Sequence, residues 1–153
     1  MDFSAILPGL RTDKYDIALS GITVTEERKE SVLFSDIYCE SPVLMAILAN
    51  GETPNAEQGE TDFSTAKIGV LTGSFFDLLA GKHFPEAEKL YYMNISDLIL
   101  NLKQEKIDGI LMDKGFFTPL GWEDKGLSYI EMDMPATEYA VAFPKASSSE
   151  ALV

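Results

Sequence analysis

The feature that most restricts the fold lies between residues 14 and 36, where a short apolar strand leads through a polar turn into the start of a helix. Apolar side chains recur at every second position, as in a β-strand, at Tyr15, Ile17 and Leu19. Thr25 is followed by two glutamates, which favour a helix N-terminus because they complement its dipole. We therefore predict a strand over 15–20, a helical turn over 25–31 and an α/β architecture.

Polar residues gather where this strand meets the helix. They are Ser20, Gly21, Thr23 and Arg28. Two hydroxyl groups, main-chain N–H groups and a guanidinium fork can converge there on a small carboxylate. The alternative is that Arg28 is a solvated helix residue that pairs with Glu26 or Asp36.

The rest of the chain repeats the alternation of helix and strand on either side of a polar connector at 50–65. A helix over 3–11 is expected to be short or bent, because Pro8 is unfavourable inside a helix. The pattern predicts further strands over 43–49, 67–71, 91–93, 107–112 and 138–143, and helices over 75–80 and 95–102. Ligands of α/β sheets bind beyond the carboxyl ends of the strands, so two strand–turn–helix units indicate two lobes facing a cleft.

The charge of the chain restricts its partners. The 153 residues include 25 acidic and 12 basic side chains, which gives a net charge of −13. A nucleic-acid partner and an anionic membrane surface are disfavoured, because both require a basic footprint. No stretch reaches the roughly 18 apolar residues that span a bilayer. The first residues show neither the basic nor the apolar region of a secretory signal peptide.

The single cysteine and the single histidine do not form a catalytic or metal-binding group. Cys39 has no second cysteine for an intrachain disulfide, and we expect it to be a small buried residue. His83 has no Ser, Cys or His companion at a useful spacing, and we expect it on the surface just past a helix end. The acidic loop at 52–62 lacks the ligand spacing of an EF-hand. The sequence therefore predicts neither a metal nor a cofactor.

The segment from 14 to 36 resembles the lobe-1 signature of the bacterial family 3 extracellular solute-binding proteins, the amino-acid receptors of ABC importers. The family pattern DxxxxGxTxTxxRxxxxxFSxxY is matched by Asp16, Gly21, Thr23, Thr25, Arg28, Phe34, Ser35 and Tyr38. In this family the pattern carries the ligand α-carboxylate site. The resemblance implies that Ser20, Gly21, Thr23 and Arg28 bind a carboxylate, within a periplasmic-binding-protein type II fold of two α/β lobes.

Two further aspects of the site follow from the resemblance. The run KIGVLTGS at 67–74 is similar to the VGVxxGS/T element of lobe 2, which implies that Ser74 and Phe75 contact the same carboxylate through a helix N-terminus. Phe3 lies in a DFxxxLPxL run that is similar to a family helix, whose aromatic residue stacks on the ligand. From the residues alone, a tight strand–helix turn and a core phenylalanine stay open as alternatives.

The run IDGILMDK at 107–114 is similar to a second lobe-2 element, the strand xDAxxxD. Its last aspartate takes the ligand ammonium group in the family, and Asp113 stands at that position here, with Gly109 in place of the usual Ala. A carboxylate at a strand end can accept charge-assisted bonds from a primary amine. The alternative is an ordinary strand-end or helix-capping aspartate.

The resemblance covers nearly the whole chain, whereas the chain does not cover the whole family fold. It implies a partial lobe 1 made of 1–40 and 138–153, and a lobe 2 made of 41–137. The opening strand, helix and strand of the family have no counterpart here, so we expect a fragment with lobe 1 truncated. An unprotected edge on the strand at 15–20 then predicts self-association or a poorly ordered lobe 1.

The resemblance implies noncatalytic binding of an amino acid or a close analogue. Hinge closure would add Ser74 and Asp113 to the site that Ser20, Thr23 and Arg28 begin. The implied location is extracytoplasmic, periplasmic or membrane-anchored, and the implied partner is the membrane permease of an ABC importer. Three alternatives stay open: the sensor domain of a membrane-bound signalling protein, a domain fused to its own permease, and a dehydratase-like enzyme with Asp113 as its acid–base group.

Overall fold

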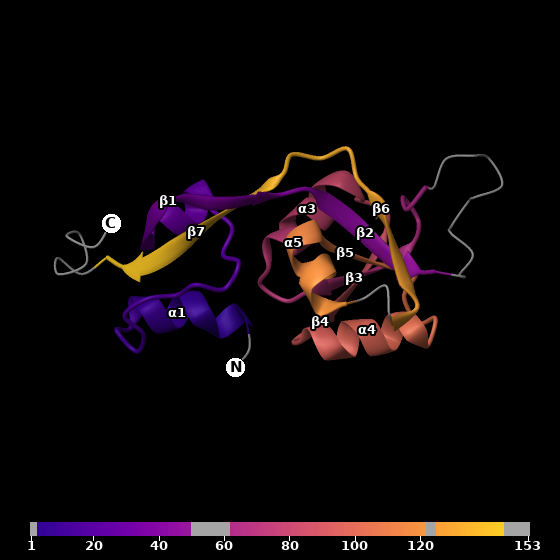
Figure 1. Ribbon diagram of the computed structural model, residues 1–153, viewed down its shortest axis with the longest axis horizontal. Helices are drawn as coiled ribbons and strands as arrows, with labels where there is room; N and C mark the ends of the chain where they lie inside the picture. Colours follow the sequence, from indigo (N-terminus) through magenta and orange to yellow (C-terminus); the bar gives the residue numbers. More distant parts are fainter. Residues whose placement is uncertain (1–2, 50–61, 122–124, 146–153) are drawn as a thin grey trace. The chain divides into compact units, whose positions relative to one another are not determined.

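The computed structural model describes residues 3–49, 62–121 and 125–145 (Figure 1). The chain divides into two compact units, each with its own β-sheet. Unit 1 consists of Met1–Ser41 and Ala136–Val153, and unit 2 consists of Pro42–Pro135. Both units combine helices with strands, so the predicted α/β class is confirmed.

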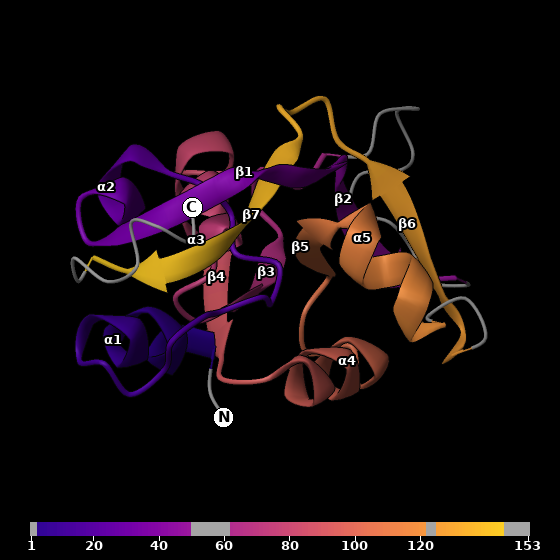
Figure 2. The ribbon, with the colours of Figure 1, turned by 60° about the vertical axis from the view of Figure 1, so that its left-hand side comes forward.

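Unit 1 is built on two antiparallel strands, β1 (Val32–Ser41) and β7 (Thr137–Pro144). A 3-10 turn, η1 (Phe3–Ala5), leads into α1 (Ile6–Arg11), and α2 (Glu26–Lys29) precedes β1. Figure 2 shows α1 beside β7 and α2 beside β1. Buried apolar side chains from these elements and from the chain between α1 and α2 form the core, namely Ile6, Leu10, Ala18, Ile22, Val32 and Ala142.

The predicted first helix is confirmed and is short, as expected. Pro8 is the third residue of α1, where its missing N–H is tolerated because the first four N–H groups of a helix have no acceptor within it. The next residue, Gly9, lies under the ring of Tyr15, and a Cβ added there would collide with that ring. The helix is therefore held to the following segment by close packing that only glycine permits.

Two expectations for unit 1 were wrong, and one strand was not predicted. The segment 15–20 is not a strand, because only Ala18 pairs, in an isolated antiparallel bridge with Ala142. The long strand β1 was missed, because its alternation is irregular and its partner β7 lies about a hundred residues away in the chain. Cys39 is exposed in β1 rather than buried, because this part of the two-stranded sheet is exposed to solvent.

Unit 2 contains a five-stranded mixed sheet with the strand order β4-β3-β5-β2-β6. The central strand β5 (Gly109–Asp113) is parallel to β3 (Lys67–Leu71) and antiparallel to β2 (Val43–Leu48). The edge strand β4 (Glu88–Tyr92) is parallel to β3, and the edge strand β6 (Leu127–Glu131) is antiparallel to β2. The apolar run at 43–46 is fully buried between its two neighbours, as a continuous apolar run indicates.

Helices of unit 2 pack on this sheet. α3 (Phe75–His83) and α4 (Ile95–Lys103) contact β3, and α5 (Lys114–Phe117) contacts β5. A 3-10 turn, η3 (Thr118–Leu120), follows α5. Asn94 is the N-cap of α4, because its Oδ1 accepts a hydrogen bond from Asp97 N at 2.9 Å. This bond satisfies one of the N–H groups that a helix start leaves without a partner.

Several boundaries in unit 2 differ from the prediction. α3 continues through Gly81, so His83 is its last residue and is exposed. The short β6 and the four-residue α5 were not predicted. Most of the polar connector at 50–65 lies outside the described residues, and so does Trp122. Over the described ranges no helix is long and apolar enough to cross a membrane. Within the same ranges, no three His, Cys, Asp or Glu side chains are grouped as metal ligands.

Candidate functional site

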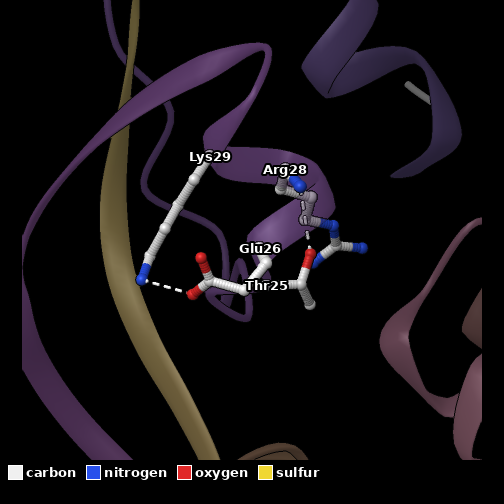
Figure 3. A network of polar contacts seen from close by, with 4 residues as sticks. All are labelled: Thr25, Glu26, Arg28 and Lys29. Atoms are coloured by element: carbon white, nitrogen blue, oxygen red, sulfur yellow. Dashed lines mark hydrogen bonds and ion pairs between the residues drawn. The ribbon is translucent and has the colours of Figure 1, made fainter.

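Arg28 is fixed in unit 1 by two hydrogen bonds of different kinds. Thr25 is the N-cap of α2, and its Oγ1 accepts a bond from Arg28 N at 3.1 Å. The Arg28 side chain turns back, and its Nη1 donates to the carbonyl oxygen of Thr23 at 2.8 Å. Glu26, the partner considered above for Arg28, instead pairs with Lys29 at 2.7 Å, and Figure 3 shows this ion pair. The guanidinium is therefore oriented by the main chain of the turn that precedes α2.

The environment of Arg28 acts on its charge. Burial lowers the pKa of its guanidinium, and the negative charges of Glu27 and of ionised Tyr139 oppose this effect. An arginine stays protonated throughout the physiological range even when burial lowers its pKa. Arg28 is thus a half-buried permanent cation, which is the kind of group that binds a carboxylate tightly.

The turn around Arg28 holds three other predicted site residues. Gly21 has φ 59°, a left-handed conformation that favours glycine. Ser20 is exposed, whereas Thr23 is buried and forms an antiparallel bridge with Tyr139 of β7. The structure thus joins Arg28 to Thr23 directly and places Ser20 and Gly21 in the same turn.

Tyr139 is a part of this region that the sequence analysis missed. Main-chain bonds on either side of its bridge to Thr23 hold β7 to the turn, from Val24 N to Glu138 O at 2.9 Å and from Ala140 N to Ile22 O at 3.3 Å. The sequence predicted that Tyr139 lies in a strand over 138–143, but it gave no indication that this strand contacts Thr23. The turn that orients Arg28 is therefore held by the C-terminal part of the described chain.

Phe3 has a different environment from the one that its predicted role requires. Its ring is half-buried and packs against the apolar core of unit 1, beside α1. This contact favours the structural alternative given above. A ligand contact of Phe3 stays a prediction.

The predicted site residues of unit 2 lie at one edge of the sheet. β3 and β5 are parallel neighbours, so their carboxyl ends meet at the same edge. Ser74 follows the end of β3 by three residues, and Asp113 is the last residue of β5. The fold therefore places a hydroxyl and a carboxylate on the same side of unit 2, at the position where α/β sheets bind ligands.

Ser74 is the N-cap of the nine-residue helix α3 and does not use its side chain for capping. It is only 9% exposed, and its Oγ atom has no hydrogen-bond partner among the described residues. A buried hydroxyl without a partner costs about 1–3 kcal/mol, so its presence calls for an explanation. Phe75 follows as the first residue of α3, and its side chain packs against the core of unit 2.

Asp113 is completely buried and caps α5, because its Oδ1 accepts a bond from Phe116 N at 3.2 Å. The capping alternative is thus correct as a description of one of its contacts. Gly109, at the start of the same strand, cannot be replaced without movement, since a Cβ there would lie 2.7 Å from Met45 Sδ. This close packing of β5 on β2 gives a physical reason for glycine at the position that the family pattern gives as alanine.

Comparisons with known proteins show which family the chain belongs to. The family model of the bacterial extracellular solute-binding proteins, family 3, matches residues 1–116. The chain is 29% identical over 129 residues to an arginine-binding periplasmic protein of Mannheimia haemolytica. The aligned region covers 84% of this chain and 50% of that protein. It is 32% identical over 119 residues to a probable histidine-binding protein of Campylobacter jejuni. The aligned region covers 75% of this chain and 45% of that protein.

A solved structure shows the same fold. The holo arginine-binding protein of T. maritima superposes with a TM-score of 0.85 over 98% of this chain and 65% of its own, at 24% sequence identity. The fold is that of the type II periplasmic amino-acid-binding proteins, as predicted. The chain belongs to the family 3 extracellular solute-binding proteins. It spans about half the length of the relatives that it matches.

Proposed function

We propose that this protein binds an α-amino acid, without catalysis, for an ABC-type importer. Arg28, with Ser20, Gly21 and Thr23, takes the ligand carboxylate in unit 1. In unit 2, Ser74 and the N-terminus of α3 contact the same carboxylate, and Asp113 takes the ammonium group. The membrane permease of the importer is the proposed partner, and the proposed location is extracytoplasmic.

The observation that carries this proposal is the buried Oγ of Ser74, which has no hydrogen-bond partner among the described residues. The N-terminus of α3 favours a negative group beside this hydroxyl, because the helix dipole places partial positive charge there. The buried carboxylate of Asp113 lies at the same edge of the sheet and favours a positive group. A zwitterion satisfies both preferences at once.

We propose further that units 1 and 2 are the two lobes of the binding protein. The chain passes between them twice, at Ser41–Pro42 and at Pro135–Ala136, and two such connections permit hinge closure. A ligand that contacts residues of both units would bind the closed state more tightly than the open one. That difference in affinity is what drives closure.

Arginine is the first candidate for the ligand. Relatives from several bacteria are named for arginine binding, others for histidine or glutamine. The net charge of −13 also favours the approach of a cationic ligand.

The test is a calorimetric titration of the protein with three compounds that differ in one group each. They are L-arginine, agmatine, which lacks the α-carboxylate, and guanidinovaleric acid, which lacks the α-amino group. We expect L-arginine to bind, and each analogue to bind at least about tenfold more weakly, since a lost charge-assisted contact costs about 1.5–3 kcal/mol or more. Equal affinity for L-arginine and agmatine would contradict the carboxylate site. If L-arginine does not bind, histidine and glutamine are titrated in the same way, and binding of either would correct the ligand.

A further inference from the structure

Tyr139 is a buried tyrosine of unit 1 that takes no part in the proposed contacts with the ligand. Its side chain is only 4% exposed, although it ends in a hydroxyl group. A buried tyrosine usually brings its hydroxyl group to a polar neighbour. The residues around Tyr139 therefore indicate what this side chain acts on.

Tyr139 lies directly opposite Thr23 in an antiparallel bridge. The main-chain hydrogen bonds lie on either side of this bridge, between the neighbouring residues of the two segments. This is the arrangement of a non-hydrogen-bonded pair, in which the Cα atoms are about 4.5 Å apart and the side chains are close together. Thr23 and Tyr139 are both buried, and as opposed residues their side chains lie on the same face.

The same bridge sets the direction of the Thr23 carbonyl group. Because the residues before and after Thr23 bond to β7, the N–H and C=O groups of Thr23 itself point away from β7. The carbonyl oxygen of Thr23 accepts the hydrogen bond from Arg28 Nη1 at 2.8 Å. The position of the Arg28 guanidinium therefore depends on the pairing of Thr23 with Tyr139.

Tyr139 also acts on Arg28 electrostatically. Its ionised phenol raises the pKa of the Arg28 guanidinium, so the phenol oxygen lies close enough for a charge interaction that solvent does not fully screen. The neutral phenol keeps a partial negative charge on this oxygen, which favours a half-buried cation beside it. The charge of Glu27 acts in the same direction, but Glu27 is exposed to solvent.

We propose that Tyr139 is a positioning residue of the carboxylate site. Its side chain fixes Thr23 from the opposite strand, and its phenol oxygen holds the Arg28 guanidinium beside the Thr23 carbonyl group. The guanidinium is then oriented before the ligand arrives, so less conformational freedom is lost on binding. Such preorganisation of one long side chain raises an affinity about two- to tenfold. The inference rests on the proposed binding of a carboxylate by Arg28.

NMR of the guanidinium groups tests the positioning without a ligand. The chain contains two arginines, Arg28 and Arg11, so isotopically labelled arginine gives signals from these two residues, and the exposed Arg11 is an internal control. Tyr139→Phe removes only the hydroxyl group. We expect the guanidinium protons of Arg28 to exchange with water at least about threefold faster in this variant, and those of Arg11 to be unaffected. An unchanged rate at Arg28 overturns the proposal.

Calorimetry tests the effect on binding. Tyr139→Phe should bind L-arginine about two- to tenfold more weakly than the parent, whereas the affinity for agmatine, which has no carboxylate, should not change. The matched control is Tyr91→Phe, which removes the hydroxyl group of an exposed tyrosine from β4 of unit 2 and should bind as the parent does. Urea unfolding midpoints of both variants should stay close to that of the parent. Equal weakening for L-arginine and agmatine would show a general structural effect and overturn the proposal.

A double-mutant cycle shows whether Tyr139 acts through Arg28. In the Arg28→Ala background, Tyr139→Phe should change the affinity for L-arginine by less than about a factor of two. The same loss in both backgrounds overturns the proposal, because Tyr139 would then act on the ligand by another route. If the parent binds L-arginine and agmatine equally, the carboxylate role of Arg28 fails. The exchange rate at Arg28 then still decides whether Tyr139 positions this side chain.

Discussion

Replacement of Arg28 by alanine separates the binding role of this residue from its structural role. The guanidinium donates a hydrogen bond to the protein main chain, from Nη1 to the carbonyl oxygen of Thr23 at 2.8 Å. The main-chain bond from Arg28 N to Thr25 Oγ1 does not involve the side chain and persists in the variant. Alanine also has the best helix propensity, so we expect α2 to form in Arg28→Ala.

The expected loss of stability is small. Loss of the bond to Thr23 costs about 1 kcal/mol. Removal of a half-buried cation offsets part of this cost, because burial of Arg28 opposes its charge and lowers its pKa. The cost of burying the charged guanidinium of Arg28 disappears only when this group loses its proton. Because its pKa lies in the strongly alkaline range, this happens only at strongly alkaline pH. Between about pH 5 and 9, the difference in unfolding free energy between the two proteins should therefore be constant and below about 1 kcal/mol.

The expected loss of binding is much larger. If the guanidinium makes two charge-assisted bonds to the ligand carboxylate, their removal costs about 3–5 kcal/mol. Each 1.4 kcal/mol is about a factor of ten in Kd, so L-arginine should bind about two to three and a half orders of magnitude more weakly. A side chain with a purely structural role would change binding and stability by similar, small amounts.

Calorimetric titration and urea unfolding of the same samples measure the two effects. The matched control is Arg11→Ala, which removes an exposed arginine from the end of α1 in the same unit. We expect the control to keep both its affinity and its stability. If Arg28→Ala binds L-arginine within a factor of about two of the control, the carboxylate role of Arg28 is refuted.

Three further predictions concern unit 2. Asp113→Asn keeps the cap of α5, because Asn caps helices as well as Asp. The free energy of unfolding should therefore change by less than about 1 kcal/mol. Calorimetry should show a much larger loss of affinity for L-arginine than for guanidinovaleric acid. Ser74→Ala removes a buried hydroxyl that has no hydrogen-bond partner among the described residues. Urea unfolding should therefore show a gain of up to about 1 kcal/mol in the free energy of unfolding, while the affinity for L-arginine falls. A loss of stability would contradict the view that this hydroxyl lacks a partner in the protein. Gly109→Ala forces Met45 to move and should cost about 1–3 kcal/mol, whereas Gly81→Ala, with open space around it in α3, should gain about 0.5–1 kcal/mol.

Local features of this protein follow from its sequence. The bounds of β3 and the position of Asp113 at the end of β5 were predicted correctly. These features depend on capping bonds, on hydrophobic periodicity and on side chains within a few residues of one another. The two glutamates after Thr25 likewise predicted a helix start, and α2 begins there. The fold class was predictable for the same reason, since it follows from the order of local elements.

Other features were decided by contacts between distant parts of the chain. Segment 15–20 has strand-like periodicity but pairs only at Ala18, whereas β1, with irregular periodicity, forms a ten-residue strand against β7. A β-ladder needs a partner, and one sequence does not indicate which segment supplies it. The exposure of Cys39, the burial of the Ser74 hydroxyl and the bridge between Thr23 and Tyr139 have the same origin. Each depends on which segments pack together, and that choice is made by the free energy of the whole unit rather than by neighbouring residues.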